Sequence, residues 1–193
     1  MCAYIRSPLK AHILKNLSGT TTTWFQQLWL EVQYKKNRSF VICVVYSPSD
    51  CHVSCFEDHL KPSLTCALSL NKPVIILGDL NCNLLQENPD SLSLSNFASE
   101  MNLKQLITSP TRITEFSRSL IDVMMTSTPD RVHESGVIST SISDHFPVRM
   151  VLNSKPPKQP PYVVTRITIL HCLQQILYLN TIQHYNQFLM RRK

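Results

Sequence analysis

The central segment of the sequence is Val74-Ile75-Ile76-Leu77-Gly78-Asp79-Leu80-Asn81. Its short, continuous apolar run predicts a strand that is buried on both faces. Because alternate side chains of a strand share a face, we expect Asp79 and Asn81 to point the same way at the strand's end. Gly78 leaves room there for the close approach of another backbone. A carboxylate beside an amide can hold a water, a metal ion or a phosphate oxygen, although Asp and Asn are also common in plain turns.

The composition suits one globular domain, or one domain with a tail. The chain has 193 residues, of which 43% are hydrophobic, and this is enough for a real core. Glycine is scarce, with 3 residues, so turns must rely on Pro, Ser, Asn and Asp. The formal net charge of +6 suits an anionic partner such as nucleic acid. No apolar run is long enough to span a bilayer, so no membrane partner is expected.

The amino terminus and the cysteines indicate an intracellular protein, nuclear or cytoplasmic. Met1 to Arg6 lacks the long apolar core and the small-residue cleavage site of a signal peptide. The seven cysteines are an odd number, and we expect their thiols to be reduced. Cys51 and Cys55, with two histidines nearby, lack the second pair of a zinc knuckle, so no zinc site is predicted.

The first half of the chain predicts a hairpin, a helix and then the central strand. Gln27 to Tyr34 partly alternates and Phe40 to Tyr46 is nearly all apolar, so these two strands are expected to pair. Met1 to Ile5 begins as the middle of a strand does. Between Asp50 and Leu70 apolar residues recur every four positions, which predicts a helix that Pro62 weakens or bends.

The second half predicts a second helix and three further strands, giving a mixed α/β (α+β type) layering around a central sheet. The helix is expected over Ser91 to Gln105, loops over Ser109 to Arg112 and from Asp130, and strands over Leu120 to Met125, Gly136 to Ile138 and Val148 to Leu152. We place the domain at residues 1–152, a Pro-rich linker at 153–162 and a tail at 163–193. The apolar spacing of the tail favours an appended amphipathic helix, or unselected sequence, over a membrane or nucleic-acid role.

Three separate places put metal-competent polar residues inside or at the end of an apolar strand: Asp79 with Asn81, Asp122, and Asp144 with His145. A carboxylate within an apolar strand is costly unless it is paired, and His145 is the natural partner of Asp122. Such a pair fixes the imidazole tautomer and leaves the other nitrogen to take a proton from water. Asp144 points to the other side of an extended backbone, where it could bind a cation such as Mg²⁺. Each residue alone could cap a turn; together they predict a site for phosphodiester hydrolysis.

The chain resembles the endonuclease/exonuclease/phosphatase family, which includes DNase I and the apurinic endonucleases. The shared late motifs are Gly78-Asp79-Leu80-Asn81, Ser119-Leu120-Ile121-Asp122 and Ser143-Asp144-His145-Phe146-Pro147-Val148. Val45-Tyr46-Ser47-Pro48 looks like the tyrosine-bearing strand end of that family. Ser109-Pro110-Thr111-Arg112-Ile113-Thr114 resembles the endonuclease domain of non-LTR (LINE-type) retrotransposons. The resemblance covers Met1 to about Leu152 and implies a partial DNase I-like four-layered β-sandwich flanked by helices.

The resemblance also implies a role for each matching residue. Asp79 and Asn81 would position the attacking water and assist the leaving oxygen, while Asp122 would orient His145 on the phosphate or the water. Tyr46 would contact the scissile phosphate. The remaining assignments are Arg112, Thr114 and Ser143 for substrate binding and Asp144 for the metal. The implied reaction is Mg²⁺- (or Mn²⁺-) dependent cleavage of DNA that leaves a 3′-hydroxyl, with no small-molecule cofactor.

The sequence departs from the family at its beginning. The family has an early strand with an Asn and then a strand with a metal-binding Glu, and the chain begins after both. Glu31 sits in the wrong motif to replace that Glu. We therefore expect an N-terminally truncated domain whose activity is impaired. The alternatives are a non-catalytic remnant with weak DNA binding and a phosphatase of the same fold. The oligomeric state is left open.

Overall fold

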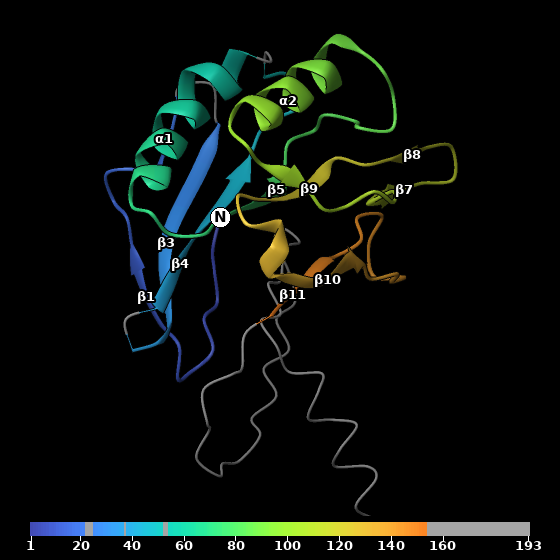
Figure 1. Cartoon of the computed structure of the whole chain (residues 1–193). Helices are drawn as coiled ribbons and strands as arrows, with labels where there is room; N and C mark the ends of the chain where they lie inside the picture. Colours follow the sequence, from blue (N-terminus) through green and yellow to red (C-terminus); the bar gives the residue numbers. More distant parts are fainter. Residues whose placement is uncertain (22–24, 37, 52–53, 154–193) are drawn as a thin grey trace, which may run out of the picture.

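The computed structural model describes residues 1–21, 25–36, 38–51 and 54–153 (Figure 1). Apart from Asn153, the predicted linker and tail lie outside the described residues. The strands are β1 (Lys10–Ile13), β2 (Gly19–Thr20), β3 (Gln26–Lys35), β4 (Arg38–Tyr46), β5 (Val74–Asp79), β6 (Lys104–Gln105), β7 (Arg112–Ile113), β8 (Arg118–Ser119), β9 (Asp122–Thr126), β10 (Val132–Val137) and β11 (Val148–Leu152). The helices are η1 (Phe56–Leu60, a π-helix), α1 (Lys61–Ser69), α2 (Pro89–Glu100) and η2 (Pro129–Arg131, a 3₁₀ turn).

The main sheet runs in the order β1-β3-β4-β5-β9-β6, with β2 also paired to β3. Strands β3 and β4 form the predicted antiparallel hairpin. The chain then crosses through η1 and α1 to β5, which pairs with β4 in parallel. A parallel pair needs such a crossover because a tight turn cannot join its ends. Strand β9 returns antiparallel to β5, so the predicted central strand has a neighbour on both sides and lies inside the sheet.

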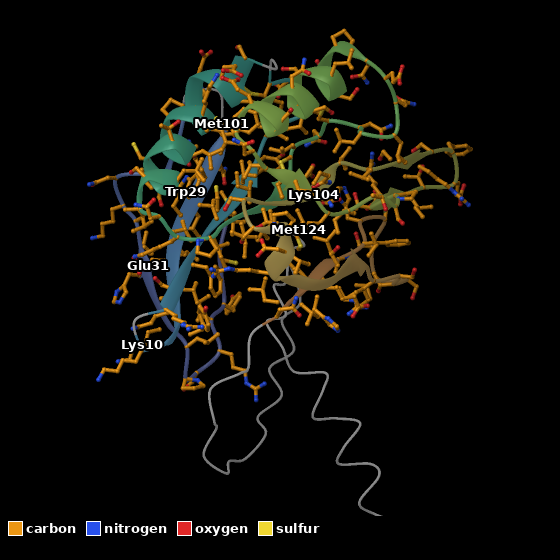
Figure 2. The ribbon with its side chains drawn as sticks, in the orientation of Figure 1. Lys10, Trp29, Glu31, Met101, Lys104 and Met124 are labelled. Atoms are coloured by element: carbon orange, nitrogen blue, oxygen red, sulfur yellow. A yellow bond between two sulfur atoms is a disulfide. The ribbon has the colours of Figure 1, made fainter. Side chains whose placement is uncertain are left out.

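The two faces of this sheet have different covers. On one face, Val41, Cys43 and Ile76 pack with the buried side chains of α1 and α2. On the other face, Ile42 and Leu77 pack with side chains of β11. Both helices accordingly lie on one side of the sheet and the β10–β11 ribbon on the other (Figure 1). Figure 2 shows Trp29, from the helix-side core, and Met124, from the ribbon-side core, within the body of the molecule.

The helices begin and end at residues whose chemistry explains the boundary. Asn88 caps α2 with its side chain, which accepts from Ser91 N–H in a capping box. Pro62 lies in the first turn of α1, directly after the π-helical η1, so the predicted disturbance occurs there. Asn71 and Asn102 follow the two helices with φ of 53° and 51°. Asparagine thus occupies the left-handed position where glycine is usual, as the scarcity of glycine requires.

Several predicted boundaries are wrong. Residues Met1 to Ile5 form no strand; β1 begins at Lys10. Helix α2 ends at Glu100 rather than Gln105, because Asn102 terminates it and β6 follows. The predicted loop at Ser109 to Arg112 enters strand β7, and the loop from Asp130 is short because β10 begins at Val132.

The cysteines near the start of η1 depart from the expectation of reduced thiols. Cys51 and Cys55 form a disulfide, with Cα atoms 6.8 Å apart. The two residues are four positions apart, and Cys55 lies directly before η1. Cys2, Cys43, Cys66 and Cys82 are free thiols. A search of the described residues for a helix long and apolar enough to cross a membrane finds none.

Candidate active site

Three polar side chains form a row across the ends of adjacent strands. Tyr46 of β4 is aligned with Asp79 of β5, and Asp79 is aligned with Asp122 of β9. By the alternation of each strand, all three belong to the face that packs against β11. The strand ends therefore present a phenol and two carboxylates side by side, on the face opposite the helices.

Gly78 allows the strands to come close at this point. A Cβ atom built there would lie 1.8 Å from the carbonyl oxygen of Val45 on β4. That distance excludes any side chain, as the sequence predicts from the position of the glycine. The contact holds β4 against β5 one residue before the Tyr46–Asp79 pair.

His145 completes the cluster from the loop that precedes β11. Its Nδ1 atom lies 3.1 Å from Oδ2 of Asp122, a carboxylate that is 2% exposed. One ligand atom from each of Asp79, Asp122 and His145 can be chosen so that all three lie within 4.8 Å of one another. The carboxylate set into an apolar strand has thus acquired a partner, and the two carboxylates and the imidazole form one group.

Burial and charge shift the protonation of this group. Burial is the main cause that raises the pKa of Asp79 to about 6, and the nearby Asp122 adds to the effect. The hydrogen bond with Asp122 is the main cause that raises the pKa of His145. The cluster therefore favours a bound proton or another positive charge, and His145 is a stronger base than an imidazole in water.

Asn81 does not share a strand face with Asp79, contrary to the sequence-based expectation. Strand β5 ends at Asp79 and Asn81 has a φ of 50°, so strand alternation does not extend to it. Its backbone N–H donates to Oδ1 of Asp79 at 2.9 Å, and its Nδ2 donates to the carbonyl of Ser47 at 2.9 Å. Ser47 N–H in turn donates to the carbonyl of Asp79. Asn81 therefore joins the ends of β4 and β5.

The residues assigned to the metal and the substrate by resemblance lie next to the cluster. Asp144 is outside it and pairs with Nε of Arg112 at 2.9 Å, which lowers the pKa of Asp144. Ser143 Oγ accepts from the His145 backbone N–H at 3.1 Å, and Thr114 contacts Ser117 in the β7–β8 turn. The roles of these four residues in binding metal or substrate stay predictions.

Sequence reasoning missed two residues that support the site. Thr111 is completely buried, and its Oγ1 accepts from the backbone N–H of Ile121 and of Asp122. Asn83 Oδ1 accepts from the backbone N–H of Leu120. No local sequence pattern marks either residue as part of a site. Thr111 belongs to the Ser109–Thr114 segment that carries the family resemblance, but the resemblance implied no role for it.

The donor set of the cluster fits a divalent cation. Asp79 and Asp122 offer carboxylate oxygens, the ligands that Mg²⁺ prefers. A cation would also offset the burial that disfavours the charged form of Asp79. His145 Nδ1 faces Asp122, so in this arrangement the carboxylates are the residues that would hold the ion.

Glu31 is engaged elsewhere. It lies opposite Val41 on β4, five residues before Tyr46, and its carboxylate pairs with Lys72 at 2.7 Å. Figure 2 shows it on β3, well away from the β7–β8 hairpin. The structure therefore agrees with the expectation that Glu31 does not contribute to the site.

Comparison with known proteins identifies the family. A family profile described as "Endonuclease-reverse transcriptase" matches residues 40–149, more than half of the chain. The chain belongs to this endonuclease family, within the endonuclease/exonuclease/phosphatase (DNase I-like) group. The matched segment runs from β4 to β11 and contains every member of the cluster. No curated protein matches the chain.

One solved structure shows the same fold, and two more are similar to a smaller extent. The endonuclease domain of TRAS1, a telomere-specific non-LTR retrotransposon, is similar with a TM-score of 0.60 at 17% identity, covering 73% of this chain and 67% of that one. An endonuclease/exonuclease/phosphatase family protein from Bacteroides thetaiotaomicron has a TM-score of 0.49 at 18% identity, covering 72% and 60%. The human Nocturnin catalytic domain has a TM-score of 0.47 at 18% identity, covering 74% and 58%. The chain thus spans 58% to 67% of the lengths of these structures.

Proposed function

We propose that the chain is a divalent-cation-dependent endonuclease domain that hydrolyses a phosphodiester bond of DNA. The observation that supports this most strongly is the cluster of Asp79, Asp122 and His145. It lies at the ends of β5 and β9 in a domain of an endonuclease family. The cluster combines a proton acceptor, its orienting carboxylate and a second carboxylate, which are the parts that activation of a water requires.

His145 is the general base in this proposal. The Asp122 carboxylate accepts from Nδ1–H, which fixes the tautomer and leaves Nε2 to take the proton of the attacking water. The raised pKa of His145 makes that transfer more favourable. Asp79 and Asn81, joined by their hydrogen bond, orient the water and assist the leaving oxygen.

A bound divalent cation, proposed to be Mg²⁺ or Mn²⁺, supplies positive charge against the phosphate oxygens. Asp79 and Asp122 are the residues that would hold it, with the family resemblance adding Asp144. Arg112 is close enough to lower the pKa of Asp79 and is proposed to bind a phosphate of the substrate, with Thr114 and Ser143 nearby. Tyr46 contacts the scissile phosphate from the end of β4.

The likeness to the TRAS1 endonuclease domain supports a retrotransposon origin. In such an element the cut would leave a 3′-hydroxyl that primes reverse transcription, and the protein would act in the nucleus or cytoplasm. The competing function is a non-catalytic remnant that binds DNA weakly. The engagement of Glu31 with Lys72 is the observation that favours it, because this carboxylate pairs away from the cluster.

A plasmid-nicking assay separates the two. Purified full-length chain is incubated with supercoiled plasmid and Mg²⁺, with or without EDTA. The proposal predicts relaxed circles with Mg²⁺, none with EDTA, and loss of nicking in His145→Ala. The matched control is His133→Ala, which removes an exposed histidine of β10. Equal inertness of wild type and His145→Ala would leave the remnant as the better description.

A further inference from the structure

Thr111 contacts both halves of the Asp122–His145 pair. Its hydroxyl oxygen accepts from the N–H of Ile121 at 3.1 Å and of Asp122 at 3.0 Å. Its carbonyl oxygen accepts from the N–H of Phe146, the residue after His145, at 2.6 Å. Its own N–H donates to Ser119. One completely buried residue is therefore bonded to the backbone at Asp122 and to the backbone beside His145.

The Thr111 hydroxyl lies beside the start of β9, on the side where no described strand pairs with these residues. Strand β6 pairs with β9 only at Met125 and Thr126. Before that point side chains complete the edge: Gln105 Oε1 accepts from Met124 N–H, and Thr111 Oγ1 accepts from Ile121 and Asp122. Without the hydroxyl these two buried amides would lose their acceptor, which is costly enough to move the backbone.

The loop that carries His145 is bonded to strand β7, which directly follows Thr111. Ile113 N–H donates to the carbonyl of Asp144, and Arg112 forms an isolated bridge with His145. With the Thr111–Phe146 bond, the backbone from Thr111 to Ile113 pairs with residues 144–146. The β7 backbone thus sets the position of the imidazole, while the Thr111 side chain sets the position of the carboxylate.

We propose that Thr111 is the positioning residue of the site: its hydroxyl and its carbonyl fix the separation of Asp122 and His145. This inference rests on the proposed function for its kinetic consequence only. It distinguishes Thr111 from a threonine that merely stabilises the fold, because the loss of its hydroxyl displaces Asp122 relative to an imidazole that the backbone still holds.

The test compares Thr111→Val, which has nearly the same shape but no hydroxyl, with Thr111→Ser, which keeps it. In the full chain we expect Thr111→Val to lower kcat for plasmid nicking on the order of 10- to 100-fold, the effect of a misplaced catalytic group, with KM nearly unchanged. Thr111→Ser restores most of that loss. The matched control is Thr126→Val, which removes a buried hydroxyl that donates to Val74 at the other end of β9. It loses stability while kcat is retained.

A second readout needs no activity. The NMR signal of the His145 Nδ1–H proton reports the hydrogen bond with Asp122, and we expect it in wild type, Thr111→Ser and Thr126→Val but shifted or absent in Thr111→Val. If nicking fails in every protein while this pattern holds, the proposed function is wrong and the positioning role stands. If Thr111→Val keeps the signal and wild-type kcat, the positioning role is wrong. Should the valine variant not fold, Thr111→Cys, with a poor acceptor, replaces it.

Discussion

At the scale of single residues, the charged form of Asp79 is the one that the proposed chemistry needs and the one that burial destabilises. Burial raises its pKa to about 6, so the folded chain binds this proton more tightly than the unfolded chain. Ionisation of Asp79 therefore removes stability as the pH rises from about 4 to about 6, and the loss is complete above that range. The proposed cation site would account for a carboxylate at this buried position.

Asp79→Asn should accordingly stabilise the cation-free chain at pH 7.5. The shift of about two pKa units corresponds to roughly 2–3 kcal/mol, and the gain should vanish at pH 4, where Asp79 is protonated in wild type. Thermal unfolding at the two pH values measures this, with Glu115→Gln, an exposed carboxylate, as control. Mg²⁺ at pH 7.5 should raise the melting temperature of wild type only. Equal melting temperatures of wild type and Asp79→Asn at pH 7.5 would contradict the account.

At the scale of elements, the β4–β5 contact at Gly78 places the two strand ends that carry Tyr46 and Asp79. Gly78→Ala forces a Cβ to within 1.8 Å of a backbone oxygen, and neither strand of a central pair can move without opening the sheet. We expect a loss of at least about 3 kcal/mol in the free energy of unfolding, measured by denaturant titration. Gly136→Ala on β10, where a Cβ meets nothing within 4 Å, should cost far less. Similar losses in both variants would show that the close approach is unimportant.

The elements also show why the sequence predicted some features and not others. Strands β4, β5 and β11 follow from short apolar runs and the α1 helix from apolar periodicity, because these elements are buried in the core. Strand β10 (Val-His-Glu-Ser-Gly-Val) was placed too late because its polar residues face solvent on a two-stranded ribbon. The end of α2 was missed although Asn102 supplied the signal. The Asp122–His145 contact could be expected from the cost of burying a carboxylate, whereas the Thr111 bonds depend on where β6 stops, which no local pattern shows.

At the scale of the whole molecule, charge divides along the chain. All 13 acidic residues precede residue 154, as do 13 of the 19 Lys and Arg residues, so the net +6 belongs to residues 154–193. Several cations of the described residues are already paired, namely Lys61, Lys72, Arg112 and Arg149. The composition-based expectation of an anionic partner therefore applies to the terminal segment rather than to the domain.

The apolar spacing of this segment did not favour a nucleic-acid role, but on the strength of its charge we now expect it to supply most of the non-specific affinity for DNA. Replacing its six Lys and Arg residues with Gln should weaken binding and reduce the slope of log K against log salt by up to about 5, near 0.9 for each lost phosphate contact. Fluorescence anisotropy with a labelled duplex across a salt series measures the slope. Lys10, Lys36 and Lys104, all exposed, serve as the control set when replaced with Gln. An unchanged slope in the tail variant would assign the affinity to residues 1–153.

Asp122 and His145 are proposed to work as one catalytic unit beside Asp79. The most direct measurement is the rate of Mg²⁺-dependent plasmid nicking by Asp122→Asn, His145→Ala and the double variant, with folding of each checked by thermal unfolding. Because a base and its orienting carboxylate act together, the double variant should be slower than His145→Ala by much less than the factor that Asp122→Asn costs in the wild-type background. Multiplying effects of the two substitutions, or undiminished nicking by either single variant, would contradict it.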